Sequence, residues 1–220
     1  LCNGLPDDIT PLAVVLIKDK LRENVNDTIN YFKEQGVALK VISGDSVKTV
    51  QNIAKDTGIT GAENAIDMTT VKTQEELEKA AENCSVFGRV TPQQKKQLVI
   101  ALKKNGHSVA MTGDGVNDVL ALKEADCSIA MAAGSDAARN VSQLVLVNND
   151  FASMPGVVAE GRRTINNLER SSALYIVKTI YTIILSVFFI FFHMPYPFEP
   201  IHFSLVGALT VGLPSFVLAL

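Results

Sequence analysis

Residues 171–220 of this 220-residue chain contain only two charged side chains, Lys178 and Glu199. Residues 171–192 read SSALYIVKTIYTIILSVFFIFF, and as a helix they would extend about 33 Å, enough to cross a hydrocarbon core of about 30 Å. The proline-rich sequence HMPYPFEP follows, and then a second, nearly uncharged stretch begins at residue 201. The pattern predicts two transmembrane helices, 171–192 and 201–220, joined by a turn at 193–200.

Basic residues precede the first predicted span and indicate its orientation. Arg162, Arg163 and Arg170 lie just before it, and positive charge next to a span favours the cytoplasmic side. We therefore expect an integral protein, most simply of the plasma membrane, with residues 1–160 as a cytoplasmic domain, residues 161–170 as a stalk and the proline-rich turn outside.

Two features of the spans are unusual for lipid-facing helices. Lys178 lies seven residues into the first span, where an ionised side chain costs about 2.5–3.5 kcal/mol, so we expect it to face a polar interior or another helix. The alternative is that its long stem reaches the cytoplasmic interface. In the second span, the sequence Gly212, Leu213, Pro214 is expected to break or loosen the helix, as at ion sites within membranes.

The first 170 residues have the pattern of an α/β domain. Acidic residues exceed basic ones by three there, which gives no electrostatic reason to expect nucleic acid as a partner. Short apolar runs alternate with helical patterns, as in a parallel sheet with crossover helices. The expected strands are 12–17, 37–42, 108–111, 128–131 and 144–147, and the expected helices lie near 25–36, 47–58, 75–81 and 91–104. The last of these helices is expected to begin at Thr91 as N-cap, with Pro92 in its first position and Gln94 at the capping-box position.

Polar residues suited to phosphate follow the predicted strands. Ser43, Gly44 and Asp45 follow one strand, and residues 112–118, TGDGVND, follow another. Because ligands of open parallel sheets bind at the carboxyl ends of the strands, these side chains are expected to lie together. Two carboxylates on a glycine-rich loop suit Mg²⁺ held jointly with a substrate phosphate, and Lys95 could supply positive charge. Taken singly, each feature also fits an ordinary turn or a solvated surface.

Residues 111–118, MTGDGVND, resemble the phosphorylation domain of P-type ATPases, ion-motive pumps of the haloacid dehalogenase superfamily. The resemblance continues over nearly the whole chain, through DKLR at 19–22, SGD at 43–45, GRVTPQQK at 88–95 and EGRRTINN at 160–167. It implies a Rossmann-like haloacid dehalogenase sheet followed by the fifth and sixth membrane helices of a pump. ATP, Mg²⁺, a transported cation, the bilayer and the remaining domains of a longer parent protein would be its cofactors and partners.

The resemblance also implies roles for single residues. Ser43 and Gly44 correspond to positions that bind the transferred phosphoryl group, Lys95 to the lysine that neutralises it, and Asn117 to an amide that contacts it. Asp114 corresponds to the Mg²⁺ ligand and Asp118 to a second carboxylate that supports the metal site. Asp45 and Arg89 correspond to positions that contact the ribose side of the nucleotide. Asp19 and Arg22 correspond to supporting residues nearby.

Three departures from the family pattern matter. The aspartate that is phosphorylated, in an Asp-Lys-Thr-Gly-Thr motif, is expected upstream of residue 1, so this chain alone should not turn over ATP. The elements Asp-Pro-x-Arg and Thr-Gly-Asp read DKLR and SGD here. Calcium pumps of the family carry an Asp where this chain has Val211, and Thr179 and Thr182 stand in place of carboxylates, so no calcium-type acidic site is visible. Lys178 is instead a candidate for a built-in positive charge on the transport pathway, together with Thr179, Thr182, Gly212 and Pro214.

Other functions share part of this pattern. A membrane-tethered haloacid dehalogenase phosphatase would use the same Ser43, Lys95, Asp114 and Asp118 without needing a broken second span. A non-catalytic regulatory module would keep the fold without the nucleophile. Within the family, a lipid flippase would also suit the neutral pathway near Val211.

Overall fold

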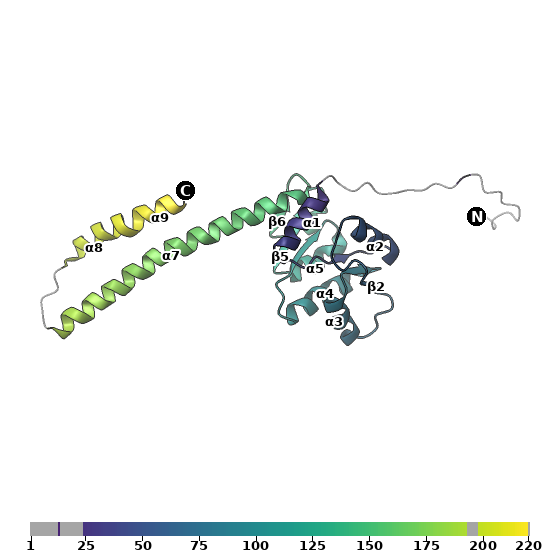
Figure 1. Cartoon of the computed structure of the whole chain (residues 1–220), viewed down its shortest axis with the longest axis horizontal. Coiled ribbons are helices and arrows are strands. Elements are labelled where there is room, and N and C mark those ends of the chain that lie inside the picture. Colours follow the sequence, from purple (N-terminus) through teal and green to yellow (C-terminus); the bar gives the residue numbers. More distant parts are fainter. Residues whose placement is uncertain (1–12, 14–23, 193–197, 220) are drawn as a thin grey trace, which may run out of the picture. The chain divides into compact units, whose positions relative to one another are not determined.

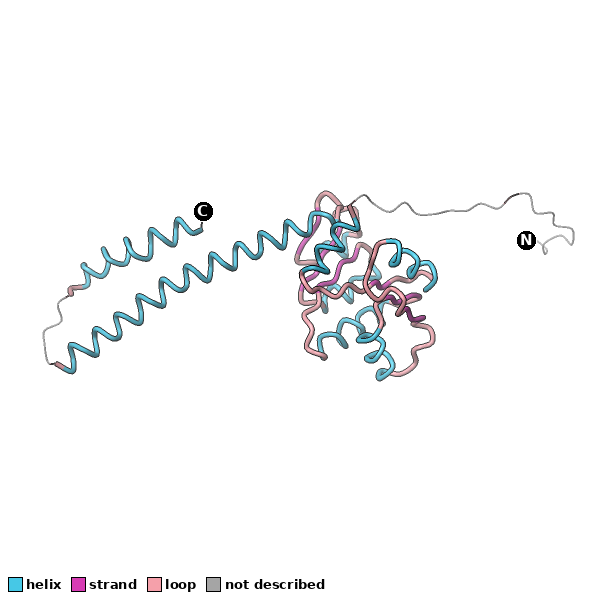
Figure 2. The backbone as a smooth tube through the Cα atoms, viewed as in Figure 1, coloured by secondary structure: helices cyan, strands magenta, loops and turns pink. Residues whose placement is uncertain are grey.

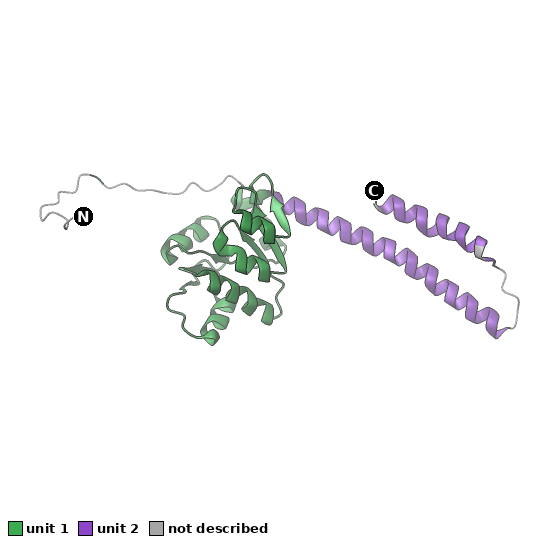
Figure 3. Ribbon diagram, turned by 180° about the vertical axis from the view of Figure 1, so that it is seen from behind, with its two compact units in different colours: residues 1–152 green, residues 153–220 purple. Residues whose placement is uncertain are grey.

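The computed structural model describes residue 13 and residues 24–192 and 198–219. The predicted strand at 12–17, together with Asp19 and Arg22, lies outside the described residues. The chain divides into two compact units, Leu1–Ala152 and Ser153–Leu220 (Figure 3). The predicted limits of the stalk, 161 and 170, both fall within one long helix of the second unit, α7 (Met154–Phe191).

The first unit contains six short parallel strands. Three of them, β1 (Val41–Ile42), β2 (Ala65–Asp67) and β3 (Val86–Gly88), form a sheet of order β1-β3-β2. The others, β4 (Ala110–Gly113), β5 (Cys127–Met131) and β6 (Leu144–Leu146), form a sheet of order β4-β5-β6 (Figure 2). The prediction of parallel strands with crossover helices is confirmed, but the strands are divided between two sheets instead of one.

Helices connect the strands (Figure 1), and those expected near 25–36, 47–58, 75–81 and 91–104 are present, whereas the helices Val119–Glu124 and Asp136–Val141 were not predicted. The N-caps show why the helices begin where they do: the Thr91 hydroxyl accepts the Gln94 N–H, and the Gln94 side chain accepts the Thr91 N–H. This reciprocal capping box is the one that the sequence predicts. The helices of the first unit are α1 (Val25–Glu34), α2 (Val47–Asp56), α3 (Gln74–Asn83), α4 (Pro92–Lys104), α5 (Val119–Glu124) and α6 (Asp136–Val141), with 3₁₀ turns at Val116–Asp118 and Phe151–Ser153.

The strand predictions are less accurate than the helix predictions. The strand expected at 37–42 is reduced to Val41–Ile42, because its partner β3 begins only at Val86 and offers residues 37–40 nothing to pair with. The strand expected at 108–111 lies two residues further on, at Ala110–Gly113. The strands β2 and β3, of three residues each, were not predicted, because runs so short carry too little periodicity to be recognised.

Helix α4 links the two sheets through opposite parts of its apolar surface. Leu98 and Ala101 belong to a buried cluster with Phe87 of β3. Val99, one position along the helix, belongs to a second buried cluster with Met111 of β4. The helix also contacts α3 on one side and α5 on the other. It therefore packs against strands of both sheets, and its first turn carries Lys95.

The second unit is a pair of apolar helices. Residues Phe151–Phe191 and Ile201–Leu218 form two helices that are long and apolar enough to cross a membrane. The second consists of α8 (Pro200–Gly207), a π-helical turn at Ala208–Gly212 and α9 (Leu213–Ala219). The Leu213 N–H donates to the Ala208 carbonyl, the wider spacing of a π-turn, directly before Pro214, which has no N–H to give. The predicted loosening of the second helix is confirmed.

Candidate functional site

The Ser43 turn follows β1 and is held together by its own side chains. The Ser43 hydroxyl donates to Asp45 Oδ2 at 3.0 Å and accepts the Asp45 N–H at 3.2 Å. The Ser43 N–H donates to the Phe87 carbonyl of β3. Gly44, between them, is exposed, and a Cβ added there would meet nothing within 4 Å. The turn thus presents an open glycine backbone beside a hydroxyl, a surface that an anion can approach.

The loop that leads from β3 into α4 is fastened to this turn. The Arg89 N–H donates to the Asp45 carbonyl at 2.8 Å, and the Val90 N–H donates to the Ser43 carbonyl at 3.0 Å. Arg89 adopts a left-handed φ of 53°, which is uncommon for a residue with a side chain. The two motifs, 43–45 and 88–95, therefore form one structural piece.

The Arg89 side chain extends from this loop toward β2. Its guanidinium lies 3.7 Å from Asp67 and is mostly exposed. The hydroxyl and backbone N–H of Thr69, which both donate to Asp67 Oδ1, hold the pKa of Asp67 below its usual value, and the Arg89 charge adds a smaller effect in the same direction. Asp67 thus keeps a negative charge near Arg89 under all ordinary conditions.

Lys95 and Asp118 form the buried centre of the site. Lys95 Nζ donates to Asp118 Oδ1 at 2.6 Å, and the two side chains are each 11% exposed. The second carboxylate oxygen, Oδ2, accepts the Gly115 N–H at 3.2 Å. The pair joins the start of α4 to the loop after β4, so two of the predicted site residues, 23 positions apart, are in direct contact.

Three residues of the 112–118 loop are exposed. Asp114, Val116 and Asn117 all face solvent, and Val116 is 66% exposed. Within the described residues, the Asp114 carboxylate takes part in no hydrogen bond or ion pair, whereas its backbone carbonyl accepts the Ser135 N–H at 2.7 Å. The loop therefore has a fixed backbone and a free carboxylate at its surface.

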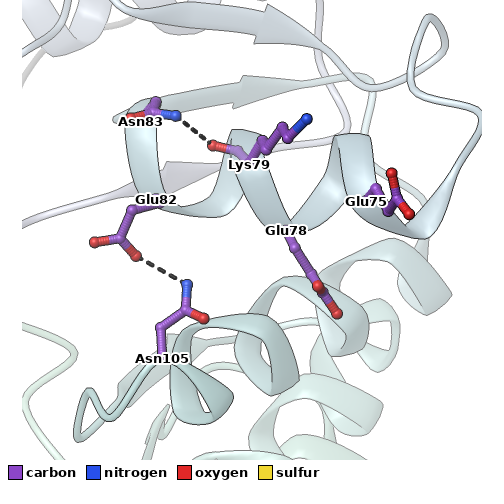
Figure 4. Close-up of a pocket in the computed structure, with 6 residues that line it drawn as sticks. All are labelled: Glu75, Glu78, Lys79, Glu82, Asn83 and Asn105. Atoms are coloured by element: carbon purple, nitrogen blue, oxygen red, sulfur yellow. Dashed lines mark hydrogen bonds between the residues drawn. The ribbon is translucent and has the colours of Figure 1, made fainter.

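Part of the site is exposed at the surface: Gly44, Asp45, Asp114 and Asn117 all face solvent. A pocket of the first unit lies elsewhere, between α3 and the end of α4, as Figure 4 shows. None of the predicted site residues lines it; its residues are Glu75, Glu78, Lys79, Glu82, Asn83 and Asn105. Among the described residues, no group of three or more His, Cys, Asp or Glu side chains could hold a metal by itself. A cation at Asp114 would therefore share its coordination with a ligand.

Several glycines position this site, and sequence reasoning did not single them out. A Cβ on Gly113 would lie 2.6 Å from the Asp118 Cβ. A Cβ on Gly134 would lie 2.7 Å from the Asp114 carbonyl oxygen, and one on Gly88 would lie within 2.7 Å of three Val47 atoms. The Gly88 and Gly134 contacts join segments 41 and 20 residues apart, so no local signal reveals these two requirements, whereas the Gly113 contact lies within one loop.

The candidate transport residues lie in the second unit. The Thr179 hydroxyl donates to the Tyr175 carbonyl at 3.0 Å, and the Thr182 hydroxyl donates to the Lys178 carbonyl at 2.8 Å. Both hydroxyls are thus hydrogen-bonded to backbone carbonyls of their own helix. Gly212 ends the π-turn and Pro214 follows it in α9.

Comparison with known proteins decides the family. The model of the haloacid dehalogenase-like hydrolases matches residues 4–126, more than half of the chain. The chain belongs to the haloacid dehalogenase-like hydrolases. This agrees with the parallel strands, the crossover helices and the loops at their carboxyl ends described above.

Curated relatives match nearly the whole chain. It is 44% identical over 226 residues to the calcium-transporting ATPase CtpE of Mycolicibacterium smegmatis, an alignment covering 98% of this chain and 28% of that protein. It is 43% identical over 221 residues to the probable cation-transporting ATPase exp7 of Streptococcus pneumoniae, an alignment that covers 97% of this chain and 28% of that protein. The resemblance to P-type ATPases is confirmed, and the chain spans about 28% of the length of these relatives.

A solved structure supports the same fold. The crystal structure of a zinc-transporting PIB-type ATPase in the E2.Pi state aligns with a TM-score of 0.66 and 20% sequence identity, covering 91% of this chain and 27% of that one. At this identity the likeness concerns the fold alone.

Proposed function

We propose that this chain is the phosphoryl-handling segment, with two membrane helices, of an ATPase that transports a cation through an aspartyl-phosphate intermediate. The buried Lys95–Asp118 pair carries this proposal. A lysine fixed by the loop after a parallel strand, on the helix whose preceding loop is hydrogen-bonded to an open Ser-Gly-Asp turn, suits a phosphoryl group. The names of the relatives, which are calcium- and cation-transporting ATPases, support the transport function.

The chain's own residues would bind and orient the phosphoryl group. Lys95 Nζ has three N–H donors and uses one on Asp118, so two remain for phosphoryl oxygens. Ser43, Gly44 and Asn117 would add a hydroxyl, a backbone N–H and an amide around the same group. Asp118 fixes the ammonium in place, so no reorganisation is needed when charge develops on the phosphoryl oxygens.

The residues present fit Mg²⁺. Asp114 offers an exposed carboxylate that is free of partners among the described residues, and Asp118, already engaged by Lys95 and Gly115, would support it as the second carboxylate. One or two carboxylates plus a substrate phosphate are the usual Mg²⁺ environment. Bound Mg²⁺ supplies positive charge that offsets the charge of the transferring phosphoryl group.

The remaining parts of the reaction would come from ATP and from the rest of the parent protein. Asp45 and Arg89 are proposed to contact the ribose side of the nucleotide, with Asp19 and Arg22 as supports. The phosphorylated aspartate is proposed to lie upstream of residue 1. The first unit is proposed to face the cytoplasm, and the two apolar helices to cross the plasma membrane. Within them the proposed transport pathway comprises Lys178, Thr179, Thr182, Gly212 and Pro214.

Phosphorylation of the full-length parent tests this function. Membranes containing the parent are given radiolabelled ATP and Mg²⁺, and the labelled protein is examined for an acid-stable, hydroxylamine-sensitive bond while the cations are varied. Calcium is the first cation to test, because a relative is named a calcium-transporting ATPase. A label that responds to one cation supports the pump. A folded protein that is never labelled would instead favour a phosphatase or a non-catalytic module.

Replacing Asp114 by Asn should raise the Mg²⁺ concentration needed for half-maximal phosphorylation about tenfold or more, because the loop loses a formal charge at the metal. The fold should be unaffected, since the side chain is exposed. Phosphoenzyme levels of the parent, measured across a Mg²⁺ titration, check this. Asp56→Asn, an identical change at an exposed position of α2, is the control. Equal Mg²⁺ requirements in the two variants would remove Asp114 from the metal site.

A further inference from the structure

The face of α7 that packs on the second apolar helix is rich in polar side chains. Residues of α7 that are partly buried recur every three or four positions, as expected for one helical face. Five of the eight such residues from 171 to 189 are polar; the eight are Ser171, Leu174, Lys178, Tyr181, Thr182, Leu185, Ser186 and Phe189. The other faces expose mainly large apolar side chains, including Ile176, Val177, Ile180, Ile183 and Ile184.

Lys178 points across this face to Gly207 of α8. A Cβ added to Gly207 would lie 2.6 Å from Lys178 Nζ and 3.6 Å from its Cε, so a side chain at 207 would displace the ammonium, the flexible end of Lys178, from this position. Gly207 lies six residues from one end of the second apolar helix, Ile201–Leu218, and eleven from the other, roughly 9 Å and 17 Å by helical rise. The ammonium is therefore held within the span and does not extend to either end of it.

Within the two apolar helices themselves, no acidic side chain lies close to this ammonium along the sequence. Between residues 171 and 220 the only acidic residue is Glu199, eight residues before Gly207, and Glu169 lies nine residues before Lys178. These separations correspond to about 12 Å and about 13.5 Å along a helix, roughly twice the reach of a lysine side chain. Among the described residues, Nζ makes no hydrogen bond or ion pair.

Two further polar groups in the hairpin also have no partner. The hydroxyl oxygens of Tyr181, one helical turn after Lys178, and Ser215 of α9 are buried, and neither forms a hydrogen bond within the part of the chain that the structure describes. Helix α7 contacts both α9 and the π-turn. Polar groups inside an apolar helix pair are stable only when they are satisfied, so this face is incomplete without another element.

We propose that Lys178 forms an ion pair with a carboxylate on another membrane-spanning segment of the parent protein, outside this chain, and that Gly207 is the positioning residue that holds the ammonium for it. Charge complementarity selects the partner, since an intramembrane ammonium without a counter-charge in its own hairpin requires an anion from elsewhere. The parent has room for such a segment, because the chain spans only 28% of its relatives' length. The inference rests on the proposed placement of both helices in a membrane.

Double-mutant cycles in the full-length parent test whether Lys178 is paired with an intramembrane carboxylate. Each intramembrane Asp or Glu of the parent is replaced by Asn or Gln, alone and together with Lys178→Met, and the thermal midpoint of the purified protein is measured. Lys178→Met alone should lower the midpoint by about 5 °C or more, and one neutralised carboxylate should restore it in the double variant. Thr179→Val, next to Lys178 but exposed, should change it little. Strict additivity for every carboxylate, or an unchanged midpoint in Lys178→Met, overturns the proposal.

A second measurement tests Gly207. Gly207→Ala should lower the midpoint with Lys178 present and leave it unchanged in a Lys178→Ala background, where the space is free. Gly161→Ala in α7, where an added Cβ meets nothing within 4 Å, is the control. Equal effects of Gly207→Ala in both backgrounds would remove it as a positioning residue. These readouts do not use phosphorylation, so a failure of the ion pair and a failure of the proposed ATPase function are distinguishable.

Discussion

Lys95→Met should lower the free energy of unfolding of the first unit by about 3–5 kcal/mol, a large share of the stability of an ordinary domain. The reason is the burial of its partner: Asp118 is 11% exposed and would keep only the Gly115 N–H as a donor. Because the chain contains no tryptophan, tryptophan fluorescence cannot follow its unfolding. Unfolding by urea, with the chain in detergent, is measured instead by the change in far-ultraviolet circular dichroism. The same variant of the parent should form no phosphoenzyme.

Two further variants separate the ion pair from general effects of losing a lysine. Lys96→Met removes the neighbouring lysine, which is 38% exposed and lies 3.6 Å from Glu124, and should cost less than about 1 kcal/mol. Lys95→Met combined with Asp118→Asn removes both charges and keeps an acceptor for Gly115, so it should recover more than half of the lost stability while remaining inactive. If Lys95→Met were as stable as Lys96→Met, the pair would not hold the site together.

Gly88→Ala should destabilise the first unit by about 3 kcal/mol and disturb the Ser43 turn. The added Cβ would lie 2.6 Å from Val47 Cγ2 and 2.7 Å from both the Cα and the N of Val47. Two of these three atoms are backbone at the start of α2, so no rotamer change relieves the overlap. Because the residues after Gly88 are hydrogen-bonded to the 43–45 turn, the displacement should also reduce phosphoenzyme formation by the parent.

Gly44→Ala is the matched control for this prediction. It makes the same chemical change in the turn itself, where an added Cβ meets nothing within 4 Å, and it should alter the unfolding free energy by less than about 0.5 kcal/mol. Urea midpoints of the two variants, measured side by side, provide the comparison. Coinciding midpoints would show that the close approach of β3 to α2 does not limit stability.

The sequence alone was sufficient for features that depend on local chemistry. The capping box of Thr91 and Gln94 placed the start of α4, and the uncharged run after residue 170 placed the two apolar helices. Proline at 214 indicated the loosened turn before it, because a missing N–H acts within one turn of helix. The motifs 43–45 and 111–118 identified the family, which the comparisons confirm.

The tertiary structure decided everything that depends on segments far apart in the chain. Strand β1 is only two residues long because β3, more than forty residues later, begins too late to pair with more. Gly88 and Gly134 are required by close contacts with other segments, and nothing in their own neighbourhood shows this. The Lys178–Gly207 contact likewise connects two helices. Local patterns report on the backbone's own hydrogen bonds and periodicity, whereas close packing is a property of the assembled fold.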